Sequence, residues 1–142
     1  MRVSELMTRE VQLVSPNSPL VEAARQMRDA DVGALPVGED GRLAGMVTDR
    51  DIVVRAVADG RALEQATVAD VLSTDVVTCR EDDSIEDAAD LMAQHQIRRL
   101  PVVRDDQQLV GIVALADIAR NDQDTGGAAL DDISEPSAQP AA

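Results

Sequence analysis

Two aspartates are the residues of this chain whose type and spacing most clearly suggest chemistry, because each lies in one copy of a repeated motif. The copies read GMVTDRDIV from position 45 and GIVALADIA from position 111. Asp51 and Asp117 hold the same place in the two copies, whereas Thr48 of the first is replaced by Ala114 in the second. An ionised carboxylate has two acceptor oxygens and can therefore receive two neighbouring O–H donors. The repeated motif thus supplies two carboxylates, only one of which has a hydroxyl three residues before it.

The spacing of Thr48 and Asp51 is also that of a helix capping box, in which each side chain bonds to the other's backbone N–H. In the second copy Ala114 cannot cap, yet Asp117 is still present. An aspartate in the first turn of a helix also stabilises that helix through its interaction with the helix dipole, without any capping partner. Capping and ligand contact therefore both stay open, and the survival of Asp117 without its capping partner favours a ligand.

Few other side chains could do catalytic chemistry. The one cysteine, Cys79, lies in an apolar run and is expected to be a small buried residue, and the one histidine, His95, ends a helical pattern and is expected to be exposed. The sequence has neither a cluster of metal-ligand residues nor a glycine-rich phosphate loop. We predict that the chain is not an enzyme, and we expect no metal site.

The composition excludes several classes of partner. The net charge is −14 and there is no lysine, so the protein repels phosphate backbones and anionic lipid. The chain also has no Phe, Tyr or Trp on which nucleic-acid bases could stack. No apolar run approaches the roughly 18 residues that a membrane span needs, and the first residues do not resemble a signal peptide. We expect no nucleic-acid partner, no membrane association and a cytoplasmic location.

The motif copies belong to a longer internal repeat. A shift of 65 residues superposes Val3 on Val68, Met27 on Met92, and the LPV of residues 35–37 on that of residues 100–102. One residue added near Gln107 moves the offset to 66 for the two motif copies. This period is longer than the 20–50 residues of solenoid repeats, so it predicts two packed halves of one pseudo-twofold module.

Each repeat has the same predicted order of elements, which is strand, helix, strand, strand, helix. Ser18-Pro19 in one repeat and Asp83 with Glu86 in the other predict the starts of the first helices, and Met27 and Met92 are predicted to lie in the core. The other predicted elements are Val11 to Val14, Leu35 to Val37, Leu43 to Val47 and Asp49 to Ala58, then Val76 to Cys79, Leu100 to Val103, Leu109 to Val113 and Leu115 to Arg120.

This organisation defines three parts of the chain. Residues 1–62 form the first repeat, residues 63–121 form the second, and residues 122–142 form a tail of small and acidic residues. The tail contains 5 of the 27 acidic residues and no basic one, which predicts disorder. The predicted fold class is α/β in the α+β sense, with two β-α-β-β-α repeats.

The β-α-β-β-α order, the LPV strand and the motif from Gly45 to Asp51 together resemble the cystathionine-β-synthase (CBS) domain. Two copies make the tandem pair known as the Bateman module. The chain is most similar to stand-alone two-repeat CBS proteins, including the hypoxic-response type, because nothing else is fused to the pair. Each of these features alone is a weak signal, whereas their combination is specific.

The resemblance implies an adenine-nucleotide site. In such proteins the motif aspartate receives the ribose hydroxyls and the threonine or serine reaches toward the phosphate, which carries over to Asp51, Asp117 and Thr48. Arg98 and Arg99 precede the second LPV, where related adenylate-sensing members place basic residues that meet phosphate. Gly33 and Ala34 hold the same two places in the first repeat, so a phosphate site there would need an arginine from elsewhere, such as Arg50. The alternative for the arginines is an exposed strand end with a surface ion pair.

The implied function is a non-catalytic regulatory module. An adenosyl ligand such as AMP, ADP, ATP or S-adenosylmethionine binds in the cleft between the two repeats, without a covalent cofactor, and a separate effector protein responds. The two pseudo-equivalent sites are expected to bind unequally. The site of Thr48 and Asp51 is expected to be the tighter one if an arginine reaches its phosphate, and Arg98 and Arg99 would reverse this order if they serve Asp117. CBS modules commonly form homodimers through their helices. The alternative is a ligand-free CBS-pair dimer that acts as a protein-interaction or stress-response module, which the incomplete second motif and the missing first arginine pair favour.

Overall fold

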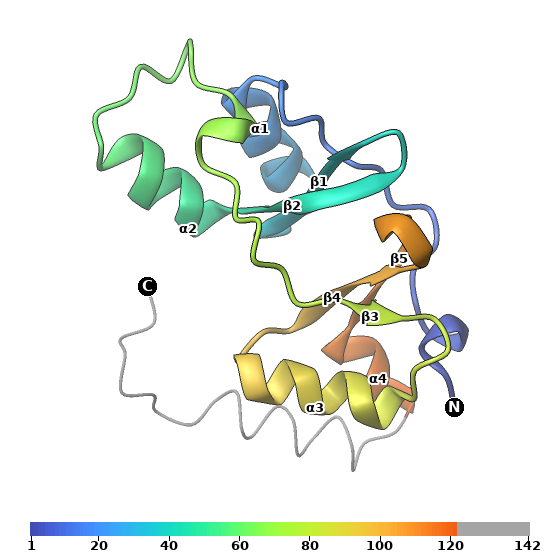
Figure 1. The fold of residues 1–142 in the computed structure, drawn as a ribbon. Coiled ribbons are helices and arrows are strands. Elements are labelled where there is room, and N and C mark those ends of the chain that lie inside the picture. Colours follow the sequence, from blue (N-terminus) through green and yellow to red (C-terminus); the bar gives the residue numbers. More distant parts are fainter. Residues whose placement is uncertain (122–142) are drawn as a thin grey trace. The chain divides into compact units, whose positions relative to one another are not determined.

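The computed structural model describes residues 1–121, and the predicted disordered tail, residues 122–142, lies outside this described part. The chain forms two compact units, each of which contains one copy of the motif (Figure 1). We call residues 12–76 the first-motif unit, because they contain Asp51. Residues 1–11 together with the chain from Val77 onward form the second-motif unit, which contains Asp117.

The first-motif unit is built on a β-hairpin. Its strands pair in antiparallel register, with Leu35 opposite Val47 and Ala34 opposite Thr48. Asp40 and Gly41 at the hairpin turn have positive φ angles of 56° and 78°, a conformation that suits this turn. The helix α1 packs against β1 and α2. The elements are α1 (Leu20–Ala30), β1 (Ala34–Glu39), β2 (Arg42–Thr48), α2 (Asp49–Ile52), the π-helical segment η2 (Val53–Val57) and the 3-10 turn η3 (Val68–Asp70).

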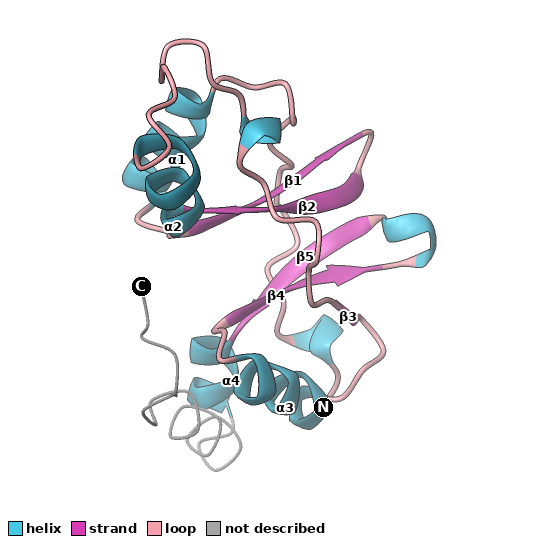
Figure 2. Ribbon diagram, turned by 60° about the vertical axis from the view of Figure 1, so that its left-hand side comes forward, coloured by secondary structure: helices cyan, strands magenta, loops and turns pink. Residues whose placement is uncertain are grey.

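The second-motif unit repeats this plan with one more strand pair. The strands form a sheet of order β3-β4-β5, in which β3 is parallel to β4 and β5 is antiparallel to it (Figure 2). The elements are the 3-10 turn η1 (Val3–Glu5), β3 (Cys79–Arg80), α3 (Ile85–His95), β4 (Arg99–Val103), the 3-10 turn η4 (Asp105–Gln107), β5 (Leu109–Ala114) and α4 (Leu115–Asn121). The predicted α+β fold class is confirmed.

The two repeats exchange their opening segments. Val3 N–H donates to the carbonyl of Asp83 at 2.8 Å, and Thr8 pairs with Ile112, so residues 1–11 pack on elements of the second repeat. The equivalent contact in the first-motif unit joins Val68 N–H to the carbonyl of Ser18 at 3.0 Å. Each compact unit is therefore completed by the opening turn of the other repeat, and its boundaries are offset from those of the sequence repeats.

Each unit has its own apolar core. Met27, Ala23 and Leu20 of α1 are buried against the hairpin, and the equivalent Met92 and Ala88 of α3 are buried in the other unit. The prediction that both methionines are core residues is confirmed. No polar or charged side chain among residues 1–121 is buried, so apolar burial rather than buried polar networks stabilises both units.

Several local predictions were wrong. The helix α1 begins at Leu20 with Pro19, not Ser18, at its N-cap, and the carbonyl of Ser18 instead accepts the N–H of Val68. The strand expected from Val76 to Cys79 covers only Cys79–Arg80. The strand expected from Val11 to Val14 is reduced to a single parallel bridge between Val14 and Val37, while its counterpart is the short strand β3. The helix α3 is capped by Ser84, whose Oγ accepts the N–H of Asp87 at 3.1 Å, rather than by Asp83. The carboxylate of Asp83 instead accepts the N–H of Arg80 at 2.9 Å, which closes the preceding turn. Within residues 1–121 no helix is long and apolar enough to cross a membrane.

Candidate functional site

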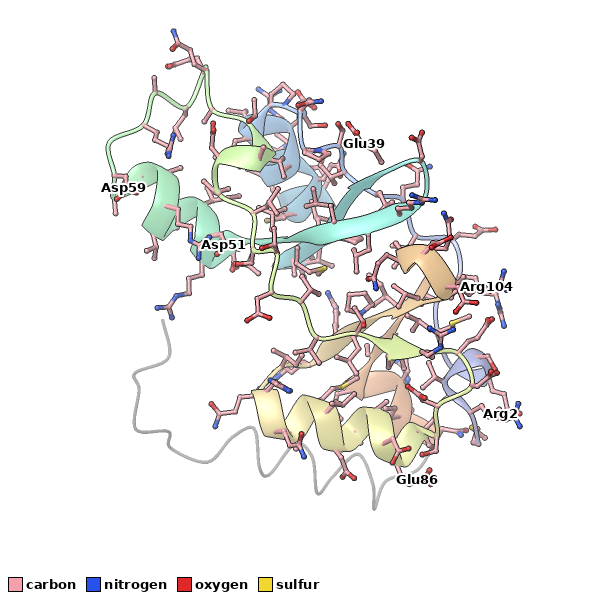
Figure 3. All side chains as sticks on the ribbon, in the orientation of Figure 1. Arg2, Glu39, Asp51, Asp59, Glu86 and Arg104 are labelled. Atoms are coloured by element: carbon pink, nitrogen blue, oxygen red, sulfur yellow. The ribbon has the colours of Figure 1, made fainter. Side chains whose placement is uncertain are left out.

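Asp51 lies at the junction where β2 passes directly into α2 (Figure 3). The predicted capping box is present: Thr48 N–H donates to Asp51 Oδ2 at 3.1 Å, and Asp51 N–H donates to Thr48 Oγ1 at 3.0 Å. The carboxylate is only 13% exposed. Because the capping bond uses Oδ2, the other oxygen, Oδ1, accepts no hydrogen bond from residues 1–121. One acceptor oxygen of this sheltered carboxylate is therefore left for another donor.

The cation nearest to this free oxygen is Arg55, one helical turn further on. Its Nε lies 3.9 Å from Asp51 Oδ1, which is an ion pair without a hydrogen bond. Sequence reasoning did not single out Arg55 and considered Arg50 instead. The Arg50 guanidinium is exposed and makes no ion pair or hydrogen bond within the described part of the chain. The i,i+4 spacing of Asp51 and Arg55 on a helix is the signal that could have identified the pair.

Asp117 occupies the equivalent position in α4, without a capping threonine. Its carboxylate accepts a hydrogen bond from the Nη2 of Arg120 and is 23% exposed. Ala114, the last residue of β5, supplies no side-chain cap. The two aspartates thus share a position at the start of a short helix, and each is paired with an arginine one turn later.

The structure brings Arg98 and Arg99 to the start of the helix that carries Asp117. The N–H of Leu115, the first residue of α4, donates to the carbonyl of Arg98 at 2.8 Å. Arg99 is the direct antiparallel partner of Ala114, so the two side chains leave the same face of the sheet. Both arginine side chains are exposed. The predicted site residues of the second repeat therefore lie together within one unit.

The first-motif unit has the same backbone but a different pair of residues at these places. The N–H of Asp49 donates to the carbonyl of Gly33 at 2.9 Å, and Ala34 is the partner of Thr48. A Cβ at Gly33 would lie 3.0 Å from Asp49 Oδ2. Ala34 therefore faces Thr48 across the strands of the first-motif unit, whereas Arg99 faces Ala114 in the second-motif unit.

The motif glycines have a structural role that sequence reasoning did not assign. A Cβ at Gly45 would lie 2.4 Å from the carbonyl oxygen of Ser73, and one at Gly111 would lie 2.7 Å from that of Thr8. These are the segments that pair with the motif strands in the two units, Ser73 with Met46 and Thr8 with Ile112. Glycine is needed because a second backbone passes directly over the strand.

The residues expected to be inert have the expected environments. Cys79 is 2% exposed in the core of its unit, and burial, with a smaller contribution from the Asp83 carboxylate, raises the pKa of its thiol to about 12. The thiol is therefore protonated at neutral pH and a poor nucleophile. His95, in the last turn of α3, is exposed.

Comparisons with known proteins agree with this architecture. The family model described as the CBS domain matches residues 3–57 and 68–124. The chain is 52% identical over 134 residues to the CBS domain-containing protein YhcV of Bacillus subtilis, a match that covers 93% of this chain and 94% of the relative. It is 41% identical over 118 residues to Hypoxic response protein 1 of Mycobacterium tuberculosis, covering 82% of each chain.

Solved structures show the same similarity. The crystal structure of Hypoxic Response Protein I with two coordinated zinc ions has a TM-score of 0.76 and 39% identity, and the match covers 85% of this chain and 98% of that one. The CBS domain pair of protein MJ0100, in complex with 5′-methylthioadenosine and S-adenosyl-L-methionine, has a TM-score of 0.72 and 29% identity over 85% and 94% of the two chains.

CBSX2 in complex with AMP has a TM-score of 0.75 and 27% identity, over 87% of this chain and 96% of that one. Two of these similar structures are thus complexes with compounds that contain adenosine. The family match, the two motif copies and the paired hairpin units lead to one conclusion: this chain belongs to the CBS-domain family and consists of a tandem pair of CBS domains.

Proposed function

We propose that this CBS pair is a non-catalytic regulatory module that binds an adenosyl ligand through Asp51 and Asp117 and signals its level to a separate effector protein. The observation that carries the proposal is the Oδ1 of the half-buried Asp51 side chain, which accepts no hydrogen bond within residues 1–121. Such an oxygen is a strong acceptor for ribose hydroxyls, because a desolvated carboxylate gains more from a new donor than an exposed one does. Complexes of similar CBS pairs with AMP, 5′-methylthioadenosine and S-adenosyl-L-methionine support the ligand class.

The two sites are proposed to differ in their preference for phosphate. Around Asp117, three arginines and one aspartate give a local charge of +2, whereas around Asp51 two arginines and two aspartates give zero. The residues counted are Arg98, Arg99, Arg120 and Asp117 in the second-motif unit, and Arg50, Arg55, Asp49 and Asp51 in the first-motif unit. We therefore expect AMP, ADP or ATP at the Asp117 site, and a neutral or cationic compound such as S-adenosylmethionine at the Asp51 site.

The Arg99–Ala114 pair gives this preference a structural basis. Ala114 lacks the hydroxyl that Thr48 offers, but its small side chain leaves space on the same face for the guanidinium of Arg99. The loss of one neutral donor is thus compensated by a charged one. This reverses the expectation from Thr48 alone, by which the Asp51 site would be the tighter one for a nucleotide.

A zinc ion is a less suitable ligand for the described part of this chain. Residues 1–121 contain no group of three or more His, Cys, Asp or Glu side chains placed to hold a metal ion. Cys79 is buried with a raised pKa, whereas zinc binds the thiolate. We therefore do not propose zinc sites like those of the Hypoxic Response Protein I structure for this chain.

Replacement of each aspartate by asparagine tests the ligand role separately from the capping role. An asparagine at position 51 can still accept the Thr48 N–H through its amide oxygen, but it loses the charge and the second acceptor oxygen. We expect Asp51→Asn and Asp117→Asn each to weaken the binding of one adenosyl ligand about tenfold or more, with unchanged thermal stability. Equilibrium dialysis against adenosine, AMP and S-adenosylmethionine measures these affinities. Unchanged affinities in both variants would mean that the aspartates only cap their helices.

We further propose a homodimer that uses the outer face of the helix formed by α2 and η2. Val53, Val54 and Val57 are 58%, 46% and 56% exposed, and their spacing places them on one side of that helix. Exposed valines at such spacing are typical of an interface that a second copy covers. Light scattering should give a dimer for the parent and a monomer for Val57→Asp. The control is Gln94→Asp, an exposed position on α3, which should stay a dimer. The same oligomeric state in parent and Val57→Asp would refute this interface.

Sensing of a nucleotide by a dimer of this kind fits the cytoplasmic location expected from the sequence. The relatives support the non-catalytic part of the proposal, since the chain covers 94% of YhcV and 92% of the protein YlbB of Bacillus subtilis, which leaves little of either for a further domain. The effector protein is expected to recognise the CBS pair in one of its two ligand states.

A further inference from the structure

The Arg55 guanidinium contacts two different parts of the first-motif unit. Its Nε faces Asp51 Oδ1 at 3.9 Å, and its Nη1 donates to the carbonyls of Val71 and Leu72, both at 3.4 Å. No backbone N–H within residues 1–121 donates to either carbonyl. Arg55 therefore bridges the aspartate proposed to bind ligand and the segment that follows η3.

That segment is the connection between the two units. Ser73 pairs with Met46 of β2 through two backbone bonds, with Ser73 N–H to Met46 O at 2.8 Å and Met46 N–H to Ser73 O at 2.9 Å. The first-motif unit ends at Val76, and the chain continues into the second-motif unit at Val77. Arg55 thus holds the connecting segment immediately before its last pairing with the motif strand.

Arg55 also has an unusual backbone position. It lies in the middle of the π-helical segment η2, where Ala58 N–H donates to the carbonyl of Val53, five residues earlier, at 2.8 Å. A π-helical turn inserts a residue into the helix and re-aims the side chains that follow, and such turns recur at functional sites. The segment therefore places Arg55 where one guanidinium can reach both the aspartate and the two carbonyls.

Within residues 1–121, the second-motif unit has no equivalent bridge. Asn121 takes the place of Arg55, and its Nδ2 lies 2.7 Å from the Sδ of Met1. Arg120, which pairs with Asp117, makes no hydrogen bond to the carbonyls of Leu6 or Met7, the counterparts of Val71 and Leu72. The bridge is therefore a property of the Asp51 site rather than of the repeat.

We propose that Arg55 couples occupancy of the Asp51 site to the connecting segment, residues 71–76, so that ligand binding releases this segment. The guanidinium is planar and rigid, so its Nε and Nη1 move together. A ribose hydroxyl that takes Asp51 Oδ1 displaces Nε and withdraws Nη1 from the two carbonyls at the same time. The coupling rests on the proposed function, because it takes Asp51 as the ligand-binding carboxylate.

Linkage requires the effect to be reciprocal. If ligand binding releases the segment, removal of the bridge must favour ligand binding. The Arg55 side chain is 51% exposed, and ion pairs of this kind contribute at most about 1 kcal/mol, so the expected gain in affinity is about fivefold. The gain is expected for adenosine, which offers the ribose hydroxyls without a phosphate.

Arg55→Met tests the coupling, because methionine keeps the apolar stem of the side chain and removes its charge and donors. Arg42→Met is the matched control, since Arg42 is an exposed arginine of the same unit, on β2, with no side-chain partner in the described part of the chain. Two quantities are measured in each protein: adenosine affinity by calorimetry, and hydrogen exchange of the Ser73 and Met46 amides by NMR, with and without adenosine.

The expected results are about fivefold tighter adenosine binding by Arg55→Met, faster exchange of both amides in the ligand-free variant, and acceleration of the same amides when adenosine binds the parent. Arg42→Met should match the parent in all three. Weaker adenosine binding by Arg55→Met would overturn the coupling and make Arg55 a ligand contact, and unchanged amide exchange in the ligand-free variant would overturn it as well. If the parent binds no adenosine, the proposed function fails, whereas the ligand-free comparison of the amides still decides whether Arg55 holds the segment.

Discussion

Replacement of Arg99 by alanine is the perturbation that most clearly separates the two proposed sites. The register places Arg99 opposite Ala114, and the Arg98 carbonyl bonds to the first residue of α4, so Arg99 emerges beside the start of the helix that carries Asp117. A nucleotide whose ribose contacts Asp117 would bring its phosphate to this position. The alanine variant removes the guanidinium and leaves the backbone pairing intact.

The expected loss of AMP affinity in Arg99→Ala follows from the exposure of the Arg99 side chain. A hydrogen bond to a charged group contributes about 1.5–3 kcal/mol, and screening at an exposed side chain favours the low end of that range. A loss of about 1.5 kcal/mol corresponds to roughly tenfold weaker AMP binding. Adenosine has no phosphate, so its affinity should not change.

Equilibrium dialysis suits this measurement, because a chain with no Trp or Tyr barely absorbs where adenine does. Arg42→Ala is the control, since Arg42 is an exposed arginine on β2 near the hairpin turn of the other unit. The reciprocal change, Ala34→Arg with Thr48→Ala, should strengthen AMP binding at the Asp51 site. Equal losses for AMP and adenosine in Arg99→Ala, or no loss of AMP affinity, would refute the assignment of Arg99 to phosphate.

Three further predictions concern stability. Burial raises the pKa of the Cys79 thiol from 9.0 to about 12 in the folded state, so the thiol loses its proton at lower pH in the unfolded state. The free energy of unfolding should therefore fall above pH 9 by up to about 1.4 kcal/mol per pH unit. Urea titrations of Cys79→Ala should show no such fall. Gly111→Ala should lower the free energy of unfolding, measured in urea, by about 2 kcal/mol or more, because the new Cβ would lie 2.7 Å from the Thr8 carbonyl oxygen. Gly60→Ala should lower it by only about 1 kcal/mol, because Gly60 has a φ of +70° but open space around it. Deletion of residues 1–9 should lower hydrogen-exchange protection in α3 and β5 and spare β1 and β2, because Val3 and Thr8 pack in the second-motif unit; equal loss in both units would contradict the exchange of opening segments.

Much of the fold could be predicted from the sequence, because its strongest signals are local. The LPV strands, the turn at Gly41 and the alternation of the motif strands predict the two hairpins, and the capping box of Thr48 and Asp51 predicts the start of α2. The strand expected at Val11 was wrong because a short apolar run does not fix strand pairing, which here reaches only Val14.

The exchange of opening segments could not be predicted from one sequence. Val3 and Val68 recur at the repeat period whether each packs on its own repeat or on the other, so the periodicity is the same for both arrangements. The role of Gly45 and Gly111 follows from that exchange, since only the passing segment makes a Cβ impossible there.

The candidate site was predicted in part. The repeated motif indicated both aspartates and the resemblance to the CBS domain indicated the two arginines before α4, but the pairing of Arg99 with Ala114 depends on the strand register. The i,i+4 spacing could have identified the Asp51–Arg55 ion pair, but the contact of Arg55 with the carbonyls of Val71 and Leu72 depends on the π-helical segment η2, for which helical periodicity gives no signal. The Arg99–Ala114 pairing and this second contact of Arg55 required the structure.

The most direct test of the central claim is equilibrium dialysis of the full chain against AMP, adenosine and S-adenosylmethionine at physiological ionic strength. Two unequal sites per chain are predicted, of which the one lost in Asp117→Asn prefers AMP and the one lost in Asp51→Asn does not. Absence of saturable binding for all three compounds would contradict the proposal that this CBS pair senses an adenosyl ligand.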